Sequence, residues 1–196
     1  LPDALISSAF GFGSQLQTSL IGSDSAVGLA NAQQFRVDGF SWGWNNTDAG
    51  IAGHRGAHTH VFPLWQGDSD LERAGRDAAE ALAYMRDIDF GLYSSDNNDG
   101  YQPAGNAVYP GGSFATQLRH LAQLIKLDTG IAVAAVDHGF WDTHEGQGMP
   151  NPGVANHYDW FGNLTEELGH ALDAFHTDLH ASGLMNRVTV VIQSEF

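Results

Sequence analysis

The sequence predicts an α/β fold in which a mostly parallel sheet is flanked by helices. Residues 131–136 ("IAVAAV") are apolar throughout, as expected of a strand that is covered on both faces. An amphipathic helix over 159–182 follows, and a second apolar strand is expected over 187–192 ("RVTVVI"). Strand–helix–strand units are almost always parallel with a right-handed crossover, so both strands should end at the same edge of the sheet.

The other secondary-structure elements are predicted from weaker sequence signals and are described here in chain order. Residues 1–35 mix glycine, serine and short apolar stretches, which favours a loop with one helix. Apolar residues at helical spacing predict a helix from Asp68 to Ile88, and they are Leu71, Ala78, Leu82 and Met85. Residues 94–112 form a long polar connection, which is typical of a functional or mobile loop.

A further helix is expected to begin at Ser113, its cap, and to end at Thr129-Gly130. No linker divides the chain, so residues 1–196 are interpreted as one α/β domain. Its first part, 1–112, is a loop-rich region with one helix, and its second part, 113–196, is an α-β-α-β core.

Composition excludes several classes of partner. The 196 residues carry a formal net charge of −15, with a single lysine, Lys126, beside seven arginines. Such an acidic surface repels nucleic acid, and no apolar run reaches the roughly 20 residues of a membrane span. The absence of cysteine excludes disulfides and thiolate metal sites.

Potential metal ligands cluster directly after the first apolar strand. The loop "DHGFWDTHE" contains five of them, Asp137, His138, Asp142, His144 and Glu145. The second strand is followed by Ser194 and Glu195. Since ligand sites of open α/β sheets lie at the carboxyl ends of the strands, Asp142, His144 and Glu195 are predicted to converge there.

Two carboxylates and an imidazole suit a divalent cation such as Zn²⁺, Mn²⁺ or Ca²⁺. Asp137 and Ser194 are expected to orient the ligands. An alternative stays open, in which Asp142 caps backbone amides of a turn and His144 lies at the surface.

Other candidates have plain structural explanations. His58 and His60 share one side of an extended segment and form an alternative metal site, although a polar loop of solvated histidines is the favoured explanation. His176 and His180 are one turn apart, but the apolar stripe of their helix runs through Phe175, so they should face water. The five tryptophans suit a sugar-binding cleft or, more simply, core packing. No Gly-x-Ser-x-Gly elbow supports a serine hydrolase.

Residues 131–148, which hold the first strand and the ligand-rich loop, and residues 171–196 resemble the bacterial domain-of-unknown-function 1501 family. Its members typically read Gly-Gly-Trp-Asp-Thr-His after the first strand and Arg-Val-Thr-Val-Val before Ser-Glu-Phe. Residues 141–144, 187–191 and 194–196 match, whereas Phe140 replaces the second glycine. The match is specific over 113–196 and weaker over 1–112.

The family is similar to the alkaline phosphatase and sulfatase superfamily, whose α/β enzymes hold two metals. The resemblance implies that Asp142 and His144 correspond to one metal-binding pair. Glu195 then takes the place of the Asp in a second pair, and Phe196 replaces its His. Compared with that pattern, the chain resembles the central portion of a longer protein and an incomplete domain.

Two functions are therefore expected. One is a metal-dependent hydrolase of small-molecule phosphate or sulfate esters, inactive as this chain alone because it lacks a candidate nucleophile. The other is a non-catalytic, exported binding or assembly subunit whose partner is another protein subunit. Family members commonly carry export signals, so the resemblance implies a periplasmic or extracellular location.

Overall fold

A three-stranded parallel sheet forms the centre of the structure. The computed structural model describes residues 7–13, 15–23, 26–32, 35, 62–147 and 159–194. Strand β1 (Ala9–Phe12) lies between β2 (Ala26–Leu29) and β3 (Val133–Val136), and both pairs are parallel. With three flanking helices, this sheet confirms the α/β class.

The two N-terminal strands correct the prediction of a loop and one helix over 1–35. All four residues of β1 are buried, and Phe12 stands opposite Leu29 and Val136 in the register. Each strand is a four-residue run that contains a glycine, "AFGF" and "AVGL". So short an apolar run has no periodicity that separates strand from loop, and its long-range pairing decides its conformation.

The three predicted helices are present with small shifts of their ends. They are α2 (Asp70–Arg86), α3 (Ser113–Lys126) and α4 (Trp160–Ala181). A capping box between Ser69 and Glu72 begins α2. The predicted cap of α3 is wrong, because Ser113 is already the first helical residue and Gly112, at φ 119°, is the N-cap.

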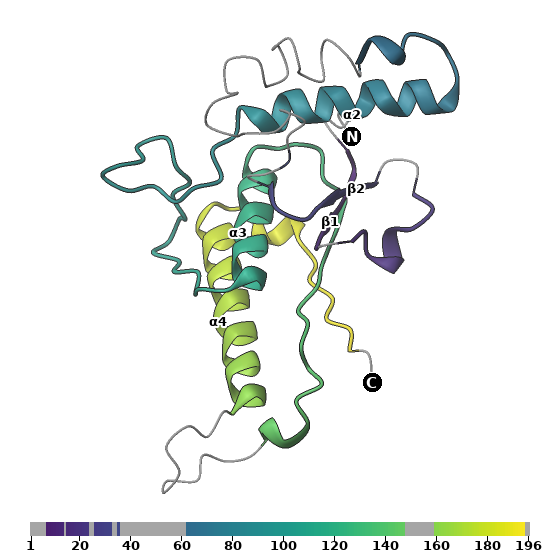
Figure 1. Cartoon of the computed structure of the whole chain (residues 1–196). Helices are drawn as coiled ribbons and strands as arrows, with labels where there is room; N and C mark the ends of the chain where they lie inside the picture. Colours follow the sequence, from purple (N-terminus) through teal and green to yellow (C-terminus); the bar gives the residue numbers. More distant parts are fainter. Residues whose placement is uncertain are drawn as a thin grey trace, which may run out of the picture.

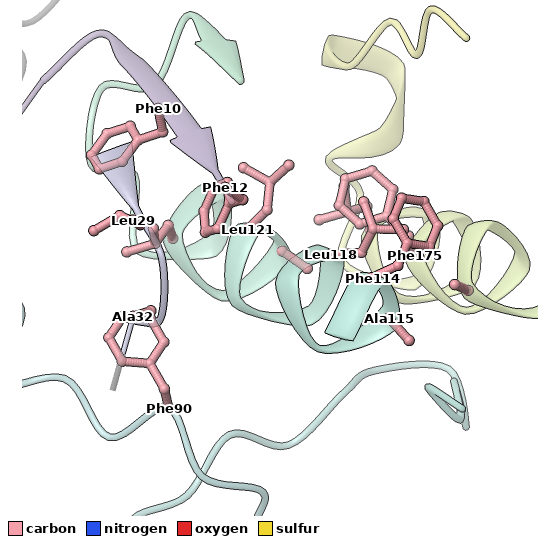
Figure 2. Close-up of a cluster of buried hydrophobic side chains, with 14 of the residues drawn as sticks. Phe10, Phe12, Leu29, Ala32, Phe90, Phe114, Ala115, Leu118, Leu121 and Phe175 are labelled. Carbon is pink, nitrogen blue, oxygen red and sulfur yellow. The ribbon is translucent and has the colours of Figure 1, made fainter. Parts of the chain in front are cut away.

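Helices α3 and α4 lie side by side (Figure 1), and α3 packs against β3 of the sheet. Figure 2 shows the core that results, in which Phe10 and Phe12 of β1 meet α3. From α4 the core receives Phe175 and Leu179, as the apolar stripe predicts. The stripe of α2 is only half correct, since Leu82 and Met85 are buried but Leu71 is 76% exposed.

The expected strand over 187–192 is not formed. After the 3-10 turn η5 (Met185–Arg187), the chain leaves as an extended segment without strand pairing, drawn in yellow in Figure 1. Val188 still packs at the edge of the core, but the side chains after it are open to solvent, with Val191 82% exposed. A strand needs a neighbour for its backbone hydrogen bonds, and β3 keeps its outer edge unpaired among the described residues. The expectation that β3 is covered on both faces is corrected too, because Val133 is 54% exposed.

The long polar connection 94–112 is held in place at two tyrosines. Leu92 forms an isolated bridge with Tyr101, and the hydroxyls of Tyr101 and Tyr109 both reach Asp178 of α4. The loop is therefore tied to the helix pair.

Among the described residues, no helix combines the length and the apolar character that crossing a membrane requires.

Candidate site at the carboxyl edge of the sheet

The carboxyl ends of β1 and β3 meet at one level of the sheet. Phe12 and Val136 are register partners, so Gly13 and Asp137 leave the sheet together. Gln17 connects the C-terminal ends of β1 and β3, since its Nε2 donates hydrogen bonds to the Phe12 carbonyl at 2.8 Å and to Asp137 Oδ2 at 3.1 Å. Asp137 is thus held by Gln17, which lies 120 positions away and could not be predicted as its partner, while its expected role of orienting metal ligands stays a prediction.

His138 occupies an aromatic pocket next to Asp137. Its ring lies 4.5 Å from that of Phe114 and 5.1 Å from that of Trp141 (centroid distances). The Trp141 indole N–H donates to the His138 carbonyl at 2.7 Å, which closes the turn between them. Glu167 of α4 approaches His138 Nε2 with Oε2 at 3.4 Å, and the His138 side chain is only 10% exposed.

The predicted ligands Asp142 and His144 lie together at the surface. His144 Nδ1 is 2.8 Å from Asp142 Oδ1, and the two side chains are 76% and 82% exposed. Metal bonds of about 2.0–2.2 Å at angles of 90–110° would put two ligand atoms roughly 3–3.5 Å apart, so a small adjustment converts this pair into a chelate. The surface exposure of His144 agrees with the metal-site interpretation and also with the alternative, in which Asp142 caps a turn, so exposure alone does not choose between them.

The other predicted ligands, Glu195, His58 and His60, lie outside the described residues. Among the residues that are described, no three acidic or histidine side chains converge as a metal site. A cation held by Asp142 and His144 therefore needs a third ligand from elsewhere.

A cavity of about 1160 Å³ adjoins these groups. Its apolar wall comes from α3, α4 and the extended segment after η5, including Leu118, Leu172 and Val188. Asp137, His138 and Asp142 border it, as does Ser194, the other residue expected to orient ligands. A mostly apolar cavity with a few polar groups at one end is the usual form of a small-molecule site.

Some buried polar atoms near this edge have no hydrogen-bond partner. Six buried side-chain atoms of the described residues lack a hydrogen-bond partner, and three of them belong to Gln17, His138 and Thr143. The other three belong to α3. Buried polar atoms are normally paired, so such a group points to a bound water, ion or ligand.

Sequence reasoning missed Gln17 and Glu167 and did not select His138. The signal for His138 was its place in the ligand-rich loop, one residue after Asp137. Gln17 and Glu167 carry no local signal, because the fold alone brings them to the site.

A family model described as "Protein of unknown function (DUF1501)" matches residues 68–196, which is most of the chain. The chain belongs to the DUF1501 family. No curated protein and no solved structure matches it. The loop 137–147, helix α4 and the segment after η5 all lie within the part that matches the DUF1501 model.

Phe140 should be a strained position in this DUF1501 loop, where the resemblance expects glycine. Its φ of 70° is left-handed and its side chain is 90% exposed, so it gains little from packing. We expect Phe140→Gly to raise the free energy of unfolding by about 0.5–1 kcal/mol, after subtraction of the entropy that glycine adds to the unfolded chain. Urea unfolding measures this. Phe140→Ala, which removes the ring and keeps a Cβ, should not reproduce the gain.

Proposed function

We propose that this DUF1501 protein is a metal-dependent hydrolase of phosphate or sulfate esters, related to the alkaline phosphatase and sulfatase superfamily. The observation that carries the proposal is the Asp142–His144 pair in the loop after β3, at the carboxyl edge of a parallel sheet and beside a large cavity that Asp137, His138 and Asp142 border. That edge is where open α/β sheets bind their ligands.

Within this proposal, Asp142 and His144 hold the cation together with Glu195. A bound divalent metal would polarise the ester oxygen or acidify a water. Asp137, fixed by Gln17, keeps the loop after β3 in register with the loop after β1. The apolar wall of the cavity would receive the organic part of the ester and exclude water from the reacting end.

Metal analysis of the purified chain tests this proposal. After dialysis against Zn²⁺ or Mn²⁺ and then metal-free buffer, the protein should retain about one equivalent of metal, and Asp142→Ala should bind it at least about tenfold more weakly. The matched control is Asp77→Ala, which removes an exposed carboxylate from α2. A metal-free wild-type protein, or an Asp142→Ala variant that binds normally, would contradict a metal centre here.

A second candidate is a non-catalytic exported subunit that reuses the fold. The exposed Val190, Val191 and Ile192 of the extended segment favour it, because contiguous exposed apolar residues mark interaction surfaces. The same metal analysis discriminates the candidates, since a binding subunit needs no stoichiometric cation. A periplasmic or extracellular location is part of both proposals.

A further inference from the structure

The outer edge of β3 carries unpaired backbone groups. Val133 donates its amide to the carbonyl of Ser8, the residue before β1. Backbone groups of a parallel strand point alternately to its two sides, so Val133 and Ala135 face β1, whereas the N–H and C=O groups of Ala134 and Val136 point away from it. The structure describes no strand on that side. An open strand edge of this kind is a template for a further strand.

The cavity of about 1160 Å³ adjoins β3 along its length. Its lining includes Ala132, Ala134 and Val136, which are alternate residues on one face of the strand. The segment 188–194 forms another part of the lining, and within the described part of the chain no backbone hydrogen bond is made by 189–193. The volume exceeds the roughly 300–1,000 Å³ of a usual small-molecule pocket, so a small ester would leave part of it empty.

Apolar side chains face the cavity from two sides. Leu168 and Leu172 of α4 border it and are only partly buried. In the segment after η5, Val190 and Ile192 also border it, and they are 45% and 68% exposed. Because side chains of a strand alternate between its two faces, every second residue of a strand added to β3 would meet this apolar surface. The residues between them would face the opposite way and would be polar.

The charge around the cavity selects the sign of those polar residues. Three aspartates, Asp128, Asp137 and Asp142, line it together with one arginine, Arg187. The whole chain has a formal net charge of −15. Opposite charges steer partners together and like charges disfavour them, so basic side chains complement this surface.

We propose that the outer edge of β3 binds an extended strand of a partner protein, whose side chains alternate between apolar and basic. The backbone of the strand pairs with Ala134 and Val136, and its apolar side chains fill the cavity. Strand addition of this kind draws affinity from main-chain hydrogen bonds and specificity from alternate side chains. The inference goes beyond the proposed hydrolase and needs no metal.

Fluorescence anisotropy of the full chain with a labelled synthetic peptide tests the proposal. The peptide Lys-Val-Lys-Val-Lys-Val-Lys has the required alternation and should bind saturably. Its control, Lys-Gly-Lys-Gly-Lys-Gly-Lys, carries the same charge without apolar side chains and should bind at least about tenfold more weakly. Equal affinity for the two peptides would reduce the effect to charge attraction and overturn the proposal, as would the absence of binding.

Two proline variants locate the binding edge. Ala134→Pro should weaken binding of the valine peptide by at least about tenfold, because it removes an outward N–H and puts a ring at the edge. Ala26→Pro is the matched control on β2, the opposite edge of the sheet. Gly13 donates to the Leu29 carbonyl, so by the same alternation Ala26 points outward, and its variant should bind normally. Equal affinities for the two variants would contradict binding at β3.

Amide hydrogen exchange of the wild-type protein, followed by NMR, requires no variant to fold. With the valine peptide, the amides of Ala134 and Val136 should exchange at least about tenfold more slowly, and those of Ala26 and Gly28 should not change. If the β3 amides are protected before peptide is added, the edge is already covered, by the chain itself in a monomer or by a second copy in a dimer. Sedimentation distinguishes these two occupants, and either one overturns the proposal. None of these measurements involves a metal, so this proposal and the proposed function fail separately.

Discussion

Replacing Asp178 with alanine should lower the free energy of unfolding by about 3–5 kcal/mol, the range for removal of one partner of a buried ion pair. Asp178 is fully buried in α4 and pairs with Lys126 of α3, the only lysine of the chain. It also accepts hydrogen bonds from Tyr101 Oη at 2.6 Å, Tyr109 Oη at 3.1 Å and the Ala104 amide at 2.7 Å.

The size of this effect follows from what the substitution leaves behind. The Lys126 ammonium, 18% exposed, would lose its counter-charge, and two hydroxyls and one amide would lose their acceptor. Burial first, and then the Asp178 carboxylate, raises the pKa of Tyr101 and of Tyr109 far above the usual range. Both tyrosines therefore remain protonated donors, and the network loses four donor interactions at once.

Urea unfolding followed by circular dichroism measures the loss. Asp173→Ala is the matched control, because Asp173 lies on the exposed side of the same helix and should change stability by less than about 0.5 kcal/mol. Equal stabilities for the two variants would show that the Asp178 cluster contributes nothing to holding the loop on the helices.

The Asp178 network also marks the limit of sequence reasoning on this fold. Helices α2, α3 and α4 and strand β3 were predictable because each carries its own local periodicity or apolar run. Tyr101 and Asp178 are 77 positions apart, and no local pattern relates them. The same holds for the N-terminal strands, whose conformation depends on partners far along the chain.

The candidate site divides in the same way. The ligand-rich loop could be predicted because it follows a recognisable strand, and the sheet geometry places it at the carboxyl edge. The predicted strand after α4 was wrong. Its residues are apolar and favour a strand, but a strand also needs a neighbouring strand to pair with, and local composition does not show whether one is present. Glu167 was invisible because on a helix it reads as an ordinary solvent-facing charge.

Lowering the pH from 7 to 5 should remove about 2 kcal/mol of stability through one residue, His120. It is only 3% exposed on α3 and packs edge-on against Phe90 at 5.0 Å. Burial, followed by the charge of Arg119, lowers the pKa of His120 from 6.5 to about 4. In the unfolded chain His120 therefore binds a proton near pH 6.5, whereas in the folded chain it does so only near pH 4. The free energy of unfolding is undiminished by this residue above about pH 6.5, and it decreases as the pH falls from 6.5 toward 4.

His120→Leu tests this by removing the titrating group from the core. The variant's free energy of unfolding should fall about 2 kcal/mol less between pH 7 and pH 5 than that of the wild-type protein, whatever its absolute stability. His170→Leu, at an exposed position of α4, should keep the wild-type pH dependence. Should both variants show that same dependence, the acid sensitivity would originate outside His120. The folded protein would then accept a proton there at little cost, which conflicts with a ring enclosed by Phe90 and the Arg119 guanidinium 3.3 Å from its Nε2.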